Sequence, residues 1–317
     1  MLVQILLLLI GLALVVFGAD YLVEGASSIA RKFGLSEFVI GLTIVGMGTS
    51  APEMVVSFIG AAQGNADISI GNVIGSNIFN TLLILGITAL LLPMPITSGN
   101  RKKDIPVNIL VTVMLLVLGL KNTLFGIGTD GLSRMDGGIL IALFLGYMIL
   151  SFLQKDPVQE EDNSRPIKPW LAVLMILGGL AALVFGGNLF VDSATYVARS
   201  MGVSDKFIAI TILAGGTSLP ELATCVAAAV KKKGQLALGN IIGSNIFNIL
   251  LILGGSALIH PLSFEGINYV DLGILLASAL AILAACRIGK RNQIDRLDGS
   301  LFLILWAAYM AYLIINL

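Results

Sequence analysis

The chain has 317 residues, of which 57% are hydrophobic and only 12% are charged. A soluble domain carries about 25% charged residues, so the composition excludes an ordinary soluble protein and indicates one embedded in the lipid bilayer. Lysine and arginine together number 19, as do aspartate and glutamate, and this balance argues against a nucleic-acid partner.

Runs of about 20 mostly apolar residues are long enough to cross a bilayer as helices. No lysine or arginine precedes Arg31, so the first apolar run lacks the basic start of a cleaved signal and is interpreted as a spanning helix. The predicted spanning helices cover residues 2–30, 37–62, 68–92, 105–120, 136–153, 169–198, 205–230, 235–259, 267–286 and 297–316. The sequence therefore predicts an all-α membrane protein with ten transmembrane helices.

Two sequence blocks occur twice, at a constant offset of 168 residues. Gly-Thr-Ser-Ala-Pro-Glu at 48–53 returns as Gly-Thr-Ser-Leu-Pro-Glu at 216–221, and the block at 71–80 returns at 239–248. Such a repeat indicates that one half of the molecule was duplicated.

The repeat predicts two five-helix units, at 1–153 and 169–317, joined by a polar linker at 154–168. Because five spans per unit is an odd number, the second unit must enter the membrane from the opposite side. The expected architecture is thus an inverted repeat with a shared site near the middle of the membrane.

Basic residues are unevenly distributed between the loops. Loops after odd-numbered spans hold 15 of the 19 lysines and arginines, and loops after even-numbered spans hold four. The positive-inside rule places the richer face in the cytoplasm. We therefore expect a multi-pass protein of the plasma (cell inner) membrane, with both termini outside and the linker 154–168 cytoplasmic.

Glu53 and Glu221 lie at the centres of their apolar segments. A charged side chain at that depth costs about 2.5–3.5 kcal/mol. No lysine or arginine occurs inside spans 2, 3, 7 and 8, which disfavours a structural ion pair. A bound cation is the better explanation for both carboxylates.

The residues around each glutamate favour broken helices. Pro52 and Pro220 each remove a helical hydrogen bond, and glycines weaken the turn before them. Irregular backbone at membrane depth is tolerated where it lines a buried or hydrated cavity. Helices 2, 3, 7 and 8 are therefore expected to be broken and to form the core.

Hydroxyl and amide oxygens accompany each carboxylate. Ser76 and Asn80 are four residues apart, so they share one helix face, as do Ser244 and Asn248. The candidate side-chain ligands are Thr49, Ser50, Glu53, Ser76, Asn80, Thr217, Ser218, Glu221, Ser244 and Asn248. An all-oxygen set suits hard cations such as Ca²⁺, Mg²⁺ or Na⁺, and its flexibility favours Ca²⁺ over Mg²⁺.

Other polar and sulfur side chains are assigned to packing. Asn77 and Asn245 point to a different helix face from the candidate ligands and are expected to join helices by hydrogen bonds. Cys225 and Cys286 are expected to be unpaired packing residues. No resident cofactor is expected.

Counting charges suggests how such a site would work. Two ionised glutamates give the site a charge of −2, which one Ca²⁺ or two Na⁺ would cancel. A neutral site crosses the membrane barrier more easily than a charged one, so exchange follows if only loaded forms change sides.

The two doubled blocks resemble the α-repeats of sodium/calcium exchangers in the cation/calcium antiporter superfamily. The resemblance implies Ca²⁺ between Glu53 and Glu221, with main-chain oxygens of Thr49 and Thr217. It also implies sliding of spans 1 and 6 and no enzymatic activity. The implied Na⁺ ligands are Ser50, Ser218, Ser76, Ser244 and the backbone at Gly46 and Ala214.

Several alternatives remain open at this point. Potassium-dependent relatives and some prokaryotic ones carry Asp where this chain has Asn248, and the Asn here favours a K⁺-independent exchanger. Proton/calcium exchangers tend to carry a histidine beside the motif glutamate, whereas Met54 and Leu222 stand there. A passive cation channel or an intramembrane hydrolase is less well supported. The oligomeric state stays open, a monomer included.

Overall fold

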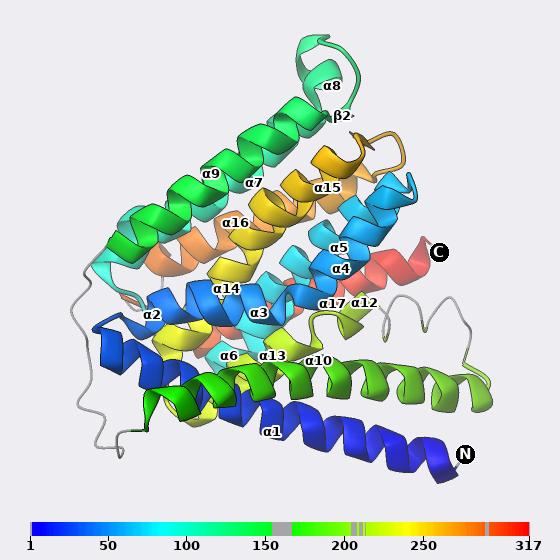
Figure 1. Ribbon diagram of the computed structural model, residues 1–317. Coiled ribbons are helices and arrows are strands. Elements are labelled where there is room, and N and C mark those ends of the chain that lie inside the picture. Colours follow the sequence, from blue (N-terminus) through cyan, green and yellow to red (C-terminus); the bar gives the residue numbers. More distant parts are fainter. Residues whose placement is uncertain are drawn as a thin grey trace.

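The computed structural model describes residues 2–153, 167–203, 208, 212, 214–288 and 292–316, and these form a helical bundle (Figure 1). In the labels used here, η marks a π-helical segment. The first half contains α1 (Leu2–Phe33), α2 (Glu37–Ile40), η1 (Gly41–Val45), α3 (Gly46–Thr49), α4 (Ala51–Ala62), α5 (Ala66–Ile78), η2 (Phe79–Ile84), α6 (Leu85–Leu91), β1 (Met94–Pro95), η3 (Asn100–Asp104), α7 (Ile105–Gly119), α8 (Lys121–Phe125), β2 (Gly131–Leu132) and α9 (Arg134–Leu153). The second half contains α10 (Pro169–Ser200), α12 (Ala214–Gly216), α13 (Leu219–Val230), α14 (Gly234–Phe247), η5 (Asn248–Leu253), α15 (Gly254–Ile259), β3 (Leu262–Ser263), α16 (Tyr269–Ile288), β4 (Gln293–Ile294) and α17 (Arg296–Ile315).

The helices follow the expected spans closely. Among the described residues, seven helices are long and apolar enough to cross a bilayer, and an eighth span forms if the bent pair Glu37–Thr49 and Ala51–Ala62 is counted as one. The two remaining predicted spans correspond to α7 and to the segment that contains α12 and α13. Part of the seventh span (204–207, 209–211 and 213) and residues 154–166 of the predicted linker lie outside the described residues.

The long helices α1 and α10 lie side by side along one edge of the bundle (Figure 1). Their backbones approach closely at small residues. A Cβ atom added at Gly11 would lie 2.8 Å from the Gly186 carbonyl oxygen, and one added at Gly18 would lie 2.8 Å from that of Gly179. The later glycine of α1 thus meets the earlier glycine of α10. These two repeat-related helices are therefore antiparallel, as an inverted repeat requires.

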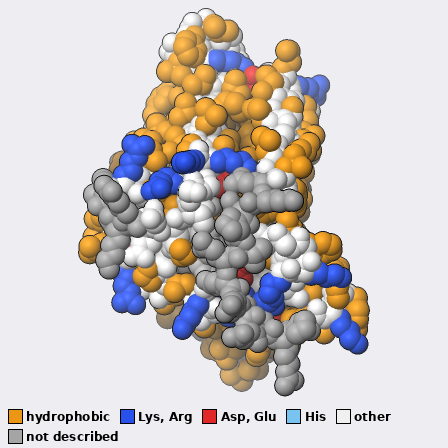
Figure 2. Space-filling model, turned by 90° about the vertical axis from the view of Figure 1, so that its left-hand side faces the viewer, with side chains coloured by type: hydrophobic (Ala, Val, Ile, Leu, Met, Phe, Trp, Pro, Cys, Tyr) orange, Lys and Arg blue, Asp and Glu red, His pale blue; other side chains and the backbone are white. Residues whose placement is uncertain are grey.

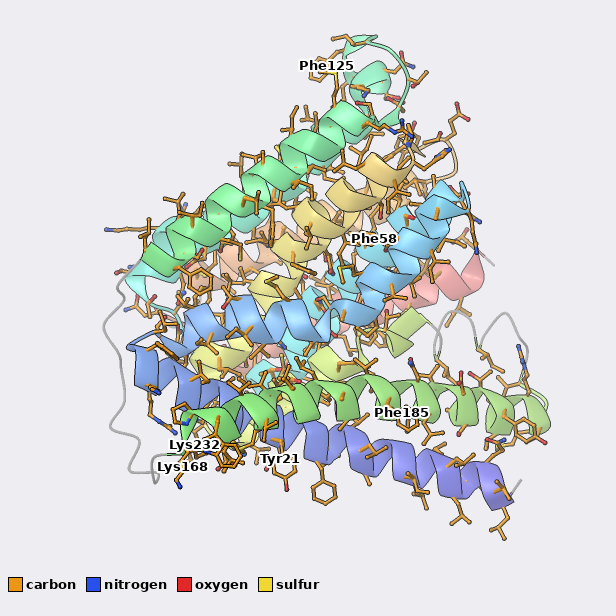
Figure 3. All side chains as sticks on the ribbon, in the orientation of Figure 1. Tyr21, Phe58, Phe125, Lys168, Phe185 and Lys232 are labelled. Atoms are coloured by element: carbon orange, nitrogen blue, oxygen red, sulfur yellow. The ribbon has the colours of Figure 1, made fainter. Side chains whose placement is uncertain are left out.

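The outward face of this pair is apolar. Side chains such as Tyr21 and Phe185 are 53% and 67% exposed, and Figure 3 shows both on the α1–α10 edge of the molecule. Small residues face the partner helix while large apolar residues face outward, which is the distribution expected for helices in contact with lipid.

Two short strand pairs join the halves. Antiparallel β1 and β4 pair Met94 with Ile294, and antiparallel β2 and β3 pair Leu132 with Leu262. Each pair takes one strand from each repeat, and β1 and β3 occupy equivalent positions at the offset of 168 residues. The two strand pairs thus reproduce the same inter-repeat connection twice.

The centre of the bundle is formed by the segments that carry the doubled blocks. Within the spanning part of Gly234–Ile259, 94% of residues are buried, and within Ala66–Leu91 the value is 72%. The corresponding values for α1 and α17 are 22% and 17%. Spans 3 and 8, two of the four predicted core helices, therefore lie inside, surrounded by the outer helices.

The core helices interrupt their α-helical geometry by sharp breaks and by π-helical segments, and span 2 contains both, since η1 precedes its break. Spans 2 and 7 break just before their glutamates, and the break in span 2 bends the helix by 49°. Spans 3 and 8 continue without a sharp bend and change to π-helix at Phe79–Ile84 and Asn248–Leu253. A π segment frees backbone carbonyl groups locally and often marks a functional position.

A close backbone contact within the core gives a test of this packing. A Cβ atom added at Gly243 would lie 2.3 Å from the Leu42 carbonyl oxygen, whereas at Gly146 no described atom lies within 4 Å. We expect Gly243→Ala to lower the free energy of unfolding by about 1–3 kcal/mol because the two helices must separate. Thermal unfolding of the detergent-purified protein measures this, with Gly146→Ala as the control. Equal melting temperatures for the two variants would contradict the packing described here.

Candidate ion-binding site

Both glutamates stand in the first turn of a helix that restarts inside the bundle. Ser50 separates α3 from α4, and Pro52 and Glu53 follow in the first turn of α4. Ser218, Pro220 and Glu221 occupy the same positions in the second repeat. Proline is well tolerated at a helix start, and the positive end of the helix dipole favours a carboxylate there.

Each carboxylate accepts a hydrogen bond from a serine of the opposite repeat. The Ser50 hydroxyl donates to Oε1 of Glu221 over 2.8 Å, and the Ser218 hydroxyl donates to Oε1 of Glu53 over 2.9 Å. All four side chains are 0% exposed. The two repeats therefore meet at a crossed pair of charge-assisted hydrogen bonds in the interior.

The other oxygen of each carboxylate has no hydrogen-bond partner. Oε2 of both Glu53 and Glu221 is buried and unpaired among the described residues, and no described lysine or arginine forms an ion pair with either side chain. Ser76 adds a longer hydroxyl contact of 3.5 Å to Oε1 of Glu53. The site thus offers two carboxylate oxygens that have no partner among the described residues.

Four asparagines form a network between the repeats. The side-chain amide of Asn248 donates to Oδ1 of Asn77 over 2.9 Å. The side-chain amide of Asn77 donates to the main-chain carbonyl of Asn245 over 3.1 Å. The Asn80 amide donates to Oδ1 of Asn245 over 3.3 Å, and Asn245 donates to the Thr81 hydroxyl over 2.9 Å. The expectation that Asn77 and Asn245 join helices is confirmed.

This network leaves the side-chain oxygens of Asn80 and Asn248 without a hydrogen bond. Oδ1 of Asn80 and Oδ1 of Asn248 are buried and have no partner among the described residues. Their amide nitrogens are already held by Asn245 and Asn77, so the amide groups cannot rotate without losing a bond. Two neutral amide oxygens are thereby left without a hydrogen bond, one turn after Ser76 and one turn after Ser244.

The threonine and backbone candidates are arranged differently. The Thr49 hydroxyl donates to Oδ1 of Asn240 over 3.1 Å and lies 3.1 Å from the Val45 carbonyl. The Thr49 hydroxyl is therefore already hydrogen-bonded within the protein, and the main-chain oxygen of Thr49 is the potential ligand. The Ser244 hydroxyl donates to the Gly46 carbonyl over 3.4 Å, so these two candidates from opposite repeats are in contact.

The equivalent residues of the second repeat lie at the same break. Ala214 begins the short helix α12, and Thr217 lies between α12 and α13, one residue before Ser218. The backbone of this segment therefore occupies the position that Gly46 and Thr49 occupy in the first repeat.

Two asparagines that support the site were not singled out from the sequence. Asn72 donates to the Glu53 carbonyl over 3.0 Å and to the Ser57 hydroxyl over 2.9 Å. Asn240 accepts from Thr49 and donates to the sulfur of Cys225 over 3.3 Å. Both belong to the doubled block, at the offset of 168 residues, so the repeat contained the signal. Cys225 and Cys286 are unpaired, as expected.

Acidic residues on α1 contact the second repeat outside the site. Lys231, directly after α13, lies 2.7 Å from a carboxylate oxygen of Asp20 and 3.4 Å from one of Glu24. His260 is exposed, with Nδ1 2.8 Å from the Pro261 carbonyl oxygen. These groups therefore belong to the surface rather than to the carboxylate pair.

Two inverted repeats of apolar helices, packed around a buried pair of carboxylates, are typical of an ion transporter. A family profile described as sodium/calcium exchanger protein matches residues 3–153 and 171–315. The chain therefore belongs to the sodium/calcium exchanger family, a family of transporters rather than enzymes, and the resemblance of the doubled blocks is confirmed.

Individual relatives agree with this assignment. CaxA of Alkalimonas amylolytica is 40% identical over 98% of both chains. The sodium/calcium exchanger MaX1 of Methanosarcina acetivorans is 33% identical, again over 98% of both chains. The solved structure of the sodium-calcium exchanger NCX_Mj, soaked with Na⁺ and Sr²⁺, superposes with a TM-score of 0.84 at 34% identity and covers 98% of both chains.

The asparagine network yields a prediction about stability. Asn77→Ala removes the acceptor for the buried Asn248 amide, so we expect a loss of about 1–3 kcal/mol in the free energy of unfolding. Asn245→Ala should have a similar effect because it removes the acceptor for the buried side-chain amide of Asn80. Thermal unfolding in detergent measures both, with the exposed Asn316→Ala as the control. Variants as stable as this control would show that the network does not hold the repeats together.

Proposed function

We propose that this protein is a secondary active antiporter that exchanges Na⁺ for Ca²⁺ by alternating access. The observation that carries the proposal is the pair of fully buried carboxylates, Glu53 and Glu221, each with an unpaired oxygen. Uncompensated buried charge is strongly unfavourable. A bound cation relieves that penalty for both carboxylates at once.

The proposed ligand set follows from the oxygens around the pair. Ca²⁺ binds Glu53 and Glu221 together with the main-chain oxygens of Thr49 and Thr217, which gives the all-oxygen coordination that this ion prefers. Na⁺ binds nearer the periphery of the site. The proposed Na⁺ ligands are Ser50, Ser218, Ser76, Ser244 and the backbone oxygens of Gly46 and Ala214, with Asn80 and Asn248 completing the site as neutral donors.

Charge and relatives both support Na⁺ and Ca²⁺ as the exchanged ions. One Ca²⁺ or two Na⁺ neutralise a site of charge −2, so each can accompany the same conformational change. MaX1 is named a sodium/calcium exchanger, and NCX_Mj is described by its ion exchange in the presence of Na⁺ and Ca²⁺. The neutral Asn80 and Asn248 favour transport without K⁺.

Access to the site is proposed to change by movement of α1 and α10. These helices form an outer pair with few buried residues, packed on each other through glycines. We place the protein in the cell inner membrane with both termini outside and the linker 154–168 in the cytoplasm. The end of α9 and the start of α10 lie opposite the two chain termini (Figure 1), which is compatible with this orientation.

The carboxylate pair can be tested directly by substitution. We expect Glu53→Gln and Glu221→Gln each to reduce Na⁺-driven uptake of radioactive Ca²⁺ into proteoliposomes by about 100-fold, because one lost charge leaves the Ca²⁺-loaded site positive. Glutamine retains the size and the hydrogen-bond acceptor of the side chain. Glu265→Gln, at an exposed loop position, serves as the control. Full transport by either site variant would eliminate the proposed mechanism.

The driving ion is tested in the same vesicles. An outward Na⁺ gradient should drive Ca²⁺ uptake at the same rate with and without K⁺. A pH gradient alone should not drive uptake, because no histidine lies at the site among the described residues. Strict dependence on K⁺ would overturn the proposed ion selectivity, and uptake driven equally well by protons would instead identify a proton/calcium exchanger of the same fold.

A further inference from the structure

A groove on the outer surface lies between α7 of the first repeat and α16 of the second. Its volume is about 560 Å³, within the range of roughly 300–1,000 Å³ that is typical of ligand sites. Neither the doubled blocks nor the carboxylate pair lines the groove. Its lining includes Arg101, Lys102, Ile109, Leu110, Leu283 and Arg287.

The two ends of the groove differ in chemistry. Arg101 and Lys102 lie in η3, directly before α7, and Arg287 lies at the last turn of α16, so three cations gather at one end. Further along α7 the lining is apolar, and Leu110 and Val113 are 65% and 37% exposed. One end therefore suits an anion, and the other suits a hydrocarbon chain.

The three cations are not neutralised by the described protein. None of them forms an ion pair with a described carboxylate, and Arg101 has only a 3.0 Å hydrogen bond to the neutral Asn292 side chain. Other lysines differ: Lys231 pairs with Asp20 and Glu24, as described above, and Lys233 lies 2.9 Å from Glu37. The groove thus holds an excess of positive charge that an external anion can balance.

The location of the groove fits a lipid ligand. Figure 2 shows lysine and arginine side chains gathered on the face where α9 ends and α10 begins, with hydrophobic side chains beyond them, and Figure 3 places Lys168 and Lys232 at the same end. Basic pockets between transmembrane helices on the cytoplasmic side are typical binding sites for anionic headgroups.

We propose that this groove binds an anionic phospholipid of the adjacent leaflet. The phosphodiester lies among Arg101, Lys102 and Arg287, and one acyl chain follows Leu110 and Val113 along α7. Because α7 and α16 belong to different repeats, the bound lipid joins the two repeats at the surface, close to the β1–β4 strand pair. This inference does not depend on which ions the protein transports.

The experiment measures thermal unfolding of the full chain in a neutral detergent. Phosphatidylglycerol, phosphatidylcholine and inorganic phosphate are added separately, and the apparent affinity follows from the rise of the melting temperature with concentration. We expect phosphatidylglycerol to stabilise the protein and the other two to have little effect. Comparing phosphatidylglycerol with phosphatidylcholine tests whether the charge of the headgroup matters. Comparing phosphatidylglycerol with inorganic phosphate tests whether the ligand is a lipid or a free phosphate.

Two matched double variants test the location. Lys102→Gln with Arg287→Gln should weaken the effect of phosphatidylglycerol by roughly fivefold for each charge removed. Lys32→Gln with Lys232→Gln removes the same charge from exposed positions outside the groove and should leave the effect unchanged. Each variant is compared with its own lipid-free melting temperature, so a change in basal stability does not affect the result.

Three outcomes overturn the proposal. Equal stabilisation by inorganic phosphate would indicate a simple anion site, and equal stabilisation by phosphatidylcholine would indicate unspecific lipid binding. Equal weakening in both double variants would assign the effect to the general charge of this face. Two results together support the assigned site. Phosphatidylglycerol alone stabilises the unmodified protein, and this stabilisation is weakened only in the groove variant.

Discussion

The structure depends on one arrangement, two buried carboxylates that are each held by a serine from the opposite repeat. Burying two like charges costs free energy, and the surrounding residues lower that cost. Helices α4 and α13 present their N-terminal ends to the carboxylates. Asparagine and serine side chains complete the polar surroundings, and apolar outer helices separate this centre from the lipid. The same arrangement makes the two repeats interdependent, since the shorter serine–glutamate hydrogen bonds all cross from one repeat to the other.

The inverted symmetry extends from the site to the periphery. The crossed serine–glutamate bonds, the Asn77–Asn248 and Asn80–Asn245 bonds, and the two strand pairs each occur as two equivalent contacts between the repeats. The equivalent serines Ser76 and Ser244 also face the site: Ser76 contacts Glu53, and Ser244 contacts the Gly46 carbonyl.

Much of this organisation was predictable because it depends on local patterns. The length of each apolar run determines how many helices cross the membrane, and an odd number per repeat makes the repeats inverted. Doubling of Glu53 and Glu221 identifies the carboxylates. The spacing of Asn77 relative to Asn80 places the two side chains on different helix faces, although the structure uses both to join the repeats. In contrast, the supporting contacts of Asn72 and Asn240 were missed, because their partners lie on other elements of the fold.

The sequence by itself determined the membrane class, the ten spans, the inverted repeat and the residues that carry oxygen into the core. These follow from hydropathy and repetition, which are properties of the chain alone. Only the tertiary structure decided that each serine bonds the glutamate of the other repeat, that the Thr49 hydroxyl is used internally, and that spans 3 and 8 change to π-helix instead of bending. Such features depend on distances between residues far apart in the chain, and the packing of α14 between both repeats sets those distances.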